Sequence, residues 1–202
     1  MYKNDKDIID LYKKRKKIWV AAYNQIKMLP EINEVIDLAL IKLVSKIANI
    51  KVPALTSNYV CRVSLPNNEG TSKTKRHIDY PSHRGSKNAL TVWLPLQDTD
   101  KKNGSLKIYP GSRKVKTYSG SLKKNLIIRK NLSGTKYEKY MIDTNFKVGQ
   151  AIMFSHFLIH ESGDNTSNTI RFSVEFRLND LSDKPYAKRY YYNNYITKRI
   201  KN

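Results

Sequence analysis

The sequence predicts a mainly β domain, an antiparallel sandwich or barrel, preceded by two helices. Three observations support this fold class. Apolar residues at helical spacing are confined to residues 1–50, the segments after Pro53 alternate with the period of two that is typical of strands, and a chain of 202 residues with 40% hydrophobic content can bury one sizeable core. In such a fold the apolar face of a sheet packs against helices, and its polar face can line a cavity.

The individual elements can be placed in order along the chain. Helices are expected over residues 5–28, ending before Pro30, and over residues 31–50. A strand is expected over 59–65 with a turn at 66–70, and three clearly alternating segments predict strands over 88–96, 151–160 and 170–178. In the last segment Arg171, Ser173, Glu175 and Arg177 share one face, and apolar residues occupy the other.

Composition restricts the class of protein. We divide the chain into N-terminal helices that support the barrel (1–50), a barrel core (51–180) and a basic, tyrosine-rich C-terminal tail (181–202). The single cysteine, Cys61, excludes an internal disulfide and a cysteine-based zinc site. No apolar run approaches the ~18 residues of a membrane span, and no apolar signal core follows the first charges. We therefore expect a cytoplasmic protein without a membrane span.

The charge is strongly basic and unevenly distributed. The chain carries 38 Lys and Arg against 17 Asp and Glu, a formal net charge of +21. Residues 101–136 hold eleven basic and no acidic side chains, whereas residues 31–100 are close to neutral. A block of this kind is either a solvated surface or a site of attraction for an anionic substrate or partner.

The pair His77 and Asp79 is the first candidate for chemistry. On an extended chain, residues i and i+2 project to the same side, so an imidazole and a carboxylate converge. A second imidazole from a distant strand completes a set of two histidines and one carboxylate, which suits non-haem Fe(II) and leaves coordination positions open. The triplet alone is a weak signal, because it also occurs as an ordinary surface pair.

A longer run of motifs strengthens this reading. His77-x-Asp79 is followed by a strand containing Trp93, by Asn103-Gly104-Ser105 and Pro110-Gly111-Ser112, and later by Gly149, Phe154, His160, Asn165, Arg171 and Ser173. In its order and spacing, the segment 58–178 resembles the phytanoyl-CoA dioxygenase family of Fe(II)/2-oxoglutarate-dependent oxygenases. Arg113 and Gln150 depart from the family pattern, which often has His and Asp there. The resemblance implies a double-stranded β-helix, a cupin-like jelly-roll barrel, for the catalytic core.

The resemblance also implies a ligand set and its cofactors: His77, Asp79 and His160 as ligands of Fe(II), with 2-oxoglutarate and O₂ as cosubstrates. The distal histidine is chosen between His156 and His160, which we place on one strand face about 13 Å apart. His160 has the family spacing to Arg171, and His156 then becomes a wall residue. Retention of Asp79 argues against halogenation, because related halogenases replace that carboxylate with a small residue.

Further residues are predicted around this centre. Arg171 and Ser173 share a strand face and offer a guanidinium fork and a hydroxyl for the far carboxylate of 2-oxoglutarate, as the family uses its Arg-x-Ser. Thr91 and Trp93, inward by alternation, are expected to contribute another hydroxyl and an aromatic wall to the cosubstrate site. Four residues are expected to contact substrate: Tyr80, His83, Arg113 and His156.

The function expected from these residues is oxidation of a C–H bond, typically hydroxylation, in a small biosynthetic metabolite. The cations that follow the Pro-Gly-Ser turn, from Arg113 through Lys116, Lys123, Lys124, Arg129 and Lys130, predict an anionic substrate. Two alternatives remain open: an oxygenase directed at nucleic acid, and a non-catalytic barrel that binds nucleic acid through basic and aromatic surface. The complete set of iron and cosubstrate motifs argues against the non-catalytic barrel.

Overall fold

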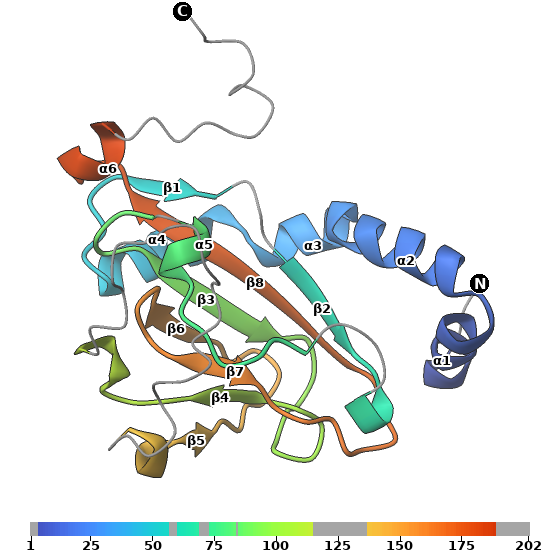
Figure 1. The fold of residues 1–202 in the computed structure, drawn as a ribbon. Coiled ribbons are helices and arrows are strands. Elements are labelled where there is room, and N and C mark those ends of the chain that lie inside the picture. The colour runs from blue at the N-terminus through green and yellow to red at the C-terminus, as the bar shows by residue number, and fades with distance from the viewer. Residues whose placement is uncertain (1–3, 57–59, 69–72, 84, 115–136, 189–202) are drawn as a thin grey trace, which may run out of the picture.

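The computed structural model describes residues 4–56, 60–68, 73–83, 85–114 and 137–188 (Figure 1). Each of the two predicted N-terminal helices is divided in the structure. Arg15, with an extended φ of −137°, separates the first pair, and Ile36 ends the third helix. The fourth begins at Asp37, whose carboxylate accepts the Leu40 backbone N–H at 2.6 Å, an N-cap worth about 1 kcal/mol. These elements are α1 (Asp5–Lys14), α2 (Lys16–Gln25), η1 (Ile26–Met28), α3 (Pro30–Val35) and α4 (Leu38–Ile47).

The strands form two antiparallel sheets, as the predicted jelly-roll class requires (Figure 1). The larger sheet has the order β1-β8-β3-β6, and β2 also pairs with β8. Its strands are β1 (Pro53–Leu55), β2 (Val60–Ser64), β3 (Leu90–Pro95), β6 (Ile152–Ser155) and β8 (Arg171–Asp180). The smaller sheet, β5-β4-β7, consists of β4 (Leu106–Ile108), β5 (Ile142–Asp143) and β7 (His160–Ser162). Among the described residues, these pairings leave two sheets rather than a closed barrel.

The expected single strand over 151–160 is wrong. The chain leaves β6 after Ser155, makes a turn, and enters β7 at His160. The Ser155 carbonyl accepts the Leu158 N–H at 2.8 Å, and the Ser155 hydroxyl accepts the Phe157 N–H at 3.3 Å. These local bonds compete with the sheet ladder and close the turn. His156 and His160 therefore do not share one strand face, and their expected separation along a continuous strand does not apply.

Strand β8 positions the site because both of its faces are buried. Its apolar face, with Val174, Phe176 and Leu178 fully buried, packs with Val44 of α4 and with the apolar face of β3. The opposite face carries the four polar residues that alternation had predicted, all of them buried: Arg171, Ser173, Glu175 and Arg177. Charged side chains are rarely buried without partners, so the polar face of β8 indicates a functional site.

The remaining elements are helix α1 and several short helices. Helix α1 contributes to a second cluster with Val63 and Ile170, and its Asp5 carboxylate accepts the Ile170 N–H at 2.8 Å. None of the described helices has the length and apolar composition needed to cross a membrane. The other short elements are η2 (Pro66–Asn68), α5 (Tyr80–His83), η3 (Ser112–Lys114), η4 (Glu138–Tyr140) and α6 (Lys184–Lys188). Part of the expected C-terminal tail, residues 189–202, lies outside the described residues. The same is true of three residues of the expected strand and turn: Tyr59, Glu69 and Gly70.

Candidate metal centre

The structure brings His77, Asp79 and His160 together. The backbones of His77 and His160 exchange two hydrogen bonds of 3.0 Å, so the segment before α5 lies against β7. The His156 carbonyl accepts the Asp79 and Tyr80 N–H groups at 3.0 and 3.1 Å, which holds the next residues in place. A pairing between segments more than eighty residues apart therefore places the second imidazole beside the His-x-Asp pair. One ligand atom from each of the three side chains lies within 4.8 Å of the other two.

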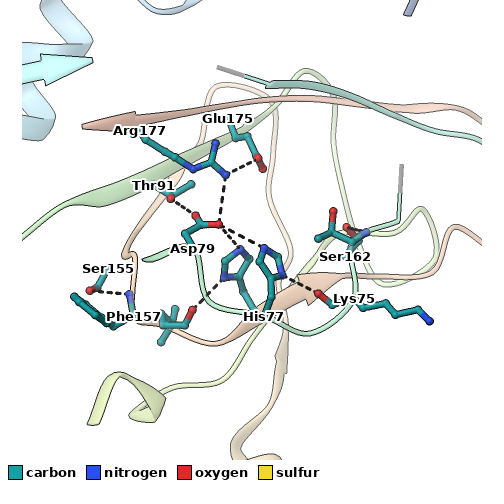
Figure 2. A network of polar contacts seen from close by, with 12 residues as sticks. Lys75, His77, Asp79, Thr91, Ser155, Phe157, Ser162, Glu175 and Arg177 are labelled. Atoms are coloured by element: carbon teal, nitrogen blue, oxygen red, sulfur yellow. Dashed lines mark hydrogen bonds and ion pairs between the residues drawn. The ribbon is translucent and has the colours of Figure 1, made fainter. Parts of the chain in front are cut away.

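The histidine tautomers fit a metal ion. His77 Nδ1 lies 2.7 Å from the Lys75 carbonyl (Figure 2). His160 Nδ1 lies 3.1 Å from the Leu158 carbonyl. A carbonyl oxygen only accepts, so each Nδ1 carries the proton and each Nε2 presents its lone pair. The two Nε2 atoms lie 3.4 and 3.8 Å from Asp79 Oδ1. Three electron-pair donors thus converge on one point, and a divalent cation satisfies all of them.

Charge and burial keep these ligands in their binding forms. Asp79 is 1% exposed, and burial alone would raise its pKa, but His160, His77 and Arg177 around it hold that pKa well below its usual range. Burial lowers the pKa of His160 to about 4, so its imidazole is neutral at physiological pH. The Thr91 hydroxyl donates to Asp79 Oδ2 and leaves Oδ1 directed at the histidines (Figure 2). The site therefore presents an ionised carboxylate at Asp79 and a neutral imidazole at His160.

One cavity joins this centre to Arg171. Arg171 is 3% exposed, and its Nη1 donates to Ser173 Oγ at 2.7 Å. Its guanidinium lies 5.8 Å from the centroid of the Trp93 ring, and its Nε has no partner among the described residues. Burial, with the nearby Arg62 charge, lowers the pKa of Arg171 to about 10. The cavity is lined by Arg62, Thr74, His77, Trp93, Leu106, His160, Ser162, Arg171 and Glu175.

The residues expected to bind 2-oxoglutarate make two kinds of contact. Arg171, Ser173 and Trp93 gather as the alternation of β8 and β3 suggested. The structure gives Thr91 a different partner from the expected one, because its hydroxyl is directed at the Asp79 carboxylate. Thr91 and Trp93 share one face of β3, where Thr91 lies opposite Arg177 of β8 and Trp93 lies opposite Glu175.

Sequence reasoning missed three charged residues of the site. Glu175 accepts Arg62 Nη2 at 3.0 Å and Arg62 Nε at 3.3 Å, and it accepts Arg177 Nη2 at 2.9 Å. The same Arg177 nitrogen lies 3.4 Å from Asp79 Oδ1 (Figure 2). The alternation of β8 already placed Glu175 and Arg177 beside Arg171, and this was the available signal. Arg62 comes from β2, where it pairs in register with Ser173.

The predicted substrate residues lie in two places. Tyr80 and His83 belong to α5; the Tyr80 ring stacks on Phe157 at 4.5 Å, and the His83 ring lies 5.9 Å from that of His156. Burial lowers the pKa values of His83 and His156 to about 4. Arg113, in η3, is exposed and lines a separate depression with Met153 and Ser155. Of the other expected substrate cations, Lys116, Lys123, Lys124, Arg129 and Lys130 lie outside the described residues.

A comparison with protein families decides the assignment. The model of the phytanoyl-CoA dioxygenase family matches residues 34–173, which contain the whole triad and Arg171. The chain belongs to the phytanoyl-CoA dioxygenase family. The resemblance found in the sequence is thus confirmed, while a comparison with curated protein sequences gives no match.

Solved structures share the fold. EctD from S. alaskensis, solved with 2-oxoglutarate and 5-hydroxyectoine, has a TM-score of 0.58 and 15% identity over 85% of this chain and 55% of EctD. The epimerase SnoN, in complex with Fe³⁺, alpha ketoglutarate and nogalamycin RO, has a TM-score of 0.57 and 18% identity over 70% of this chain and 55% of SnoN. AviO1 from Streptomyces viridochromogenes Tue57 has a TM-score of 0.55 and 17% identity, over 78% of this chain and 64% of AviO1.

These findings confirm the fold class and the expected cofactors of a phytanoyl-CoA dioxygenase family member. The SnoN structure contains Fe³⁺ and alpha ketoglutarate, which is another name for 2-oxoglutarate, and the EctD structure contains 2-oxoglutarate. The set of His77, Asp79 and His160 could bind iron. The chain spans only 55–64% of the length of the three solved structures. Substrate and reaction outcome are therefore matters for proposal.

Proposed function

We propose that the protein is an Fe(II)/2-oxoglutarate-dependent oxygenase that hydroxylates, or otherwise oxidises, a C–H bond of a small anionic biosynthetic metabolite. The observation that carries this proposal is that one cavity contains both histidines of the triad and a buried arginine, Arg171, that has no carboxylate at ion-pair distance among the described residues. A buried guanidinium without a carboxylate at ion-pair distance is costly, and a bound dicarboxylate offsets that cost.

In this proposal, one set of residues binds iron and another binds 2-oxoglutarate. Iron bound by His77, Asp79 and His160 supplies O₂-dependent oxidation coupled to decarboxylation of 2-oxoglutarate. Arg171 and Ser173 hold the far carboxylate of the cosubstrate, and the Trp93 ring forms a wall that excludes water. Positioning of this kind converts an encounter of separate reactants into a reaction within one complex.

The substrate class rests on two lines of support. The similar structures SnoN and EctD carry small molecules, nogalamycin RO and 5-hydroxyectoine. The basic block 101–136 includes the Pro-Gly-Ser turn, and Arg113 and Lys114, which follow that turn directly, are exposed. Exposed cations raise the local concentration of anions at a protein surface, and this attraction weakens as salt screens it over about 8–10 Å.

The test is Fe(II)-dependent turnover of 2-oxoglutarate against a panel of anionic and neutral metabolites, measured as succinate formed. We expect at least one anionic metabolite to stimulate turnover, with efficiency falling as ionic strength rises. Asp79→Ala and His160→Ala should abolish both iron binding and turnover, because each removes a ligand from the three-residue set. His156→Ala is the matched histidine control and should retain iron binding.

Three results would contradict the proposal at different levels. Turnover by Asp79→Ala would refute the assignment of Asp79 as an iron ligand. If His156→Ala loses iron while His160→Ala keeps it, the distal ligand is His156 and not His160. A neutral preferred substrate whose turnover is indifferent to salt would leave the reaction class intact and refute the anionic substrate.

A further inference from the structure

Two buried carboxylates compete for one arginine beside the metal centre. Arg177, with its side chain 4% exposed, directs Nη2 at both Glu175 Oε1, at 2.9 Å, and Asp79 Oδ1, at 3.4 Å. The first distance is an ordinary hydrogen bond, whereas the second exceeds the usual range for N–H···O bonds. Figure 2 shows the guanidinium between the two acids. Arg177 thus binds Glu175 more closely than it binds the metal ligand.

The geometry of Arg177 departs from what a guanidinium prefers. Arginine and a carboxylate typically form two parallel hydrogen bonds, and that arrangement is the strongest available to them. Here Arg177 Nε and Nη1 are buried and have no partner among the described residues. Only Nη2 is used, and it is shared. Arg177 could form a closer pair with Asp79 if Glu175 did not hold it.

Glu175 is itself firmly held. Arg62 makes two hydrogen bonds to it, Nη2 to Oε1 at 3.0 Å and Nε to Oε2 at 3.3 Å, from the neighbouring strand β2. Burial raises the pKa of Glu175, but Arg62 and Arg177 outweigh that effect and keep the pKa below its usual value. Glu175 is therefore a fixed anion at neutral pH. The four side chains Arg62, Glu175, Arg177 and Asp79 alternate in charge.

We propose that Arg177 is a positioning residue that neutralises Asp79 in the metal-free site, and that Glu175 provides the alternative anion to which Arg177 withdraws when a metal ion binds. This inference rests on the proposed iron site. A divalent cation at Asp79 Oδ1 repels a guanidinium on the same oxygen, so binding requires Arg177 to give up that contact. Glu175 makes the withdrawal possible without leaving a buried cation unpaired.

The proposal predicts opposite effects from the two residues. In Glu175→Gln, Arg177 loses its alternative anion and remains on Asp79, so metal binding should weaken about 10- to 100-fold, the range seen for residues that support metal ligands. In Arg177→Met, Asp79 no longer has a competing cation, so metal binding should tighten. Glu175 keeps both bonds from Arg62 in that variant, and Met fills the buried volume.

The decisive measurement is a double-mutant cycle on metal affinity. Co(II) is titrated anaerobically into the metal-free protein and followed by its visible absorption, for wild type, Glu175→Gln, Arg177→Met and the double variant. Because Glu175 acts through Arg177, Glu175→Gln should change affinity by no more than about threefold in the Arg177→Met background. Lys147→Met removes one cation from an exposed ion pair with Asp98 and controls for net charge; its affinity should equal that of wild type.

The outcomes separate this inference from the iron site. If wild type binds no Co(II), or if Asp79→Ala binds it equally well, the iron site fails and this inference fails with it. If wild type binds Co(II) and Glu175→Gln has the same effect in both backgrounds, or Arg177→Met weakens binding, the inference alone is overturned. Should Glu175→Gln fail to fold, as circular dichroism reports, the direction of the Arg177→Met effect decides.

Discussion

Two buried arginines on the same face of β8 have opposite surroundings. Arg171 and Arg177 are each 3% exposed and are six residues apart, about 20 Å along a strand. Arg177 is shared by the carboxylates of Glu175 and Asp79. Arg171 donates to the Ser173 hydroxyl and lies over the Trp93 ring, and it forms no ion pair with a described acidic residue.

The different partners of Arg171 and Arg177 suggest different functions for the two arginines. A buried charge with internal partners is part of the protein's own structure, whereas one with only a hydroxyl for a partner lacks the counter-charge that burial normally requires. The lowered pKa of Arg171, caused by burial and by Arg62, expresses that deficit. The contrast supports the proposals that Arg177 positions Asp79 and that Arg171 binds a carboxylate from outside the chain.

Giving Arg171 an internal anion should make it resemble Arg177. Ser173 Oγ lies 2.7 Å from Arg171 Nη1, so in Ser173→Asp a carboxylate occupies the position expected for the cosubstrate. We expect the apparent constant for 2-oxoglutarate to rise more than about a hundredfold, because a charge-assisted bond is lost and a like charge is added. Steady-state kinetics with varied 2-oxoglutarate measures this. Ser173→Asn, similar in size but neutral, should have a much smaller effect, and equal effects would refute the electrostatic explanation.

Substitution of Arg171 should change the apparent constant for 2-oxoglutarate, whereas substitution of Arg177 should not. Arg171→Ala should raise the apparent constant for 2-oxoglutarate roughly ten- to a hundredfold, which corresponds to about 1.5–3 kcal/mol for a bond to a charged group. The constant for the prime substrate should change far less. Arg177→Met should leave the 2-oxoglutarate constant unchanged once the protein is saturated with Fe(II). An unchanged constant in Arg171→Ala would end the assignment of Arg171 to the cosubstrate.

Asp180, at the end of β8, is a buried carboxylate whose hydrogen-bond donors are neutral groups. It tests whether such donors can stabilise a buried charge that has no ion-pair partner among the described residues. Burial raises the pKa of Asp180, but hydrogen bonds from Asn88, Ser182, Val52 and Lys51 outweigh it and hold the pKa below its usual value. Its stabilising contribution is therefore complete above the unfolded value of about 3.9 and is lost as the pH falls below it.

Asp180→Asn should lower the free energy of unfolding at pH 7 by about 1–2 kcal/mol, because ionised hydrogen bonds become neutral ones. Urea denaturation between pH 7 and pH 3 measures this, and the difference from wild type should shrink below about pH 4. A difference that stays constant with pH would show that the ionised form of Asp180 has no special role.

Local pattern accounted for part of this molecule. The alternation of β8 and β3 predicted which residues face inward, and both faces are as expected. The helical periodicity was correct in kind but wrong in extent, because it does not detect a break such as that at Arg15 or the new N-cap at Asp37. The strand expected over 151–160 failed because alternation continued through residues whose backbone turns at Ser155.

The sequence by itself determined the residue types of the metal centre and the near pair His77 and Asp79, because residues two apart on an extended chain face the same way. Family spacing selected His160 among the distal histidines, and the structure places that residue against His77. Only the tertiary structure decided which charges meet. Arg62 and Glu175 are 113 residues apart, and Asp79 and Arg177 are 98 apart. Periodicity reports the face on which a side chain lies, whereas an ion pair depends on which strands become neighbours and in what register, and that is decided by the packing of the whole chain.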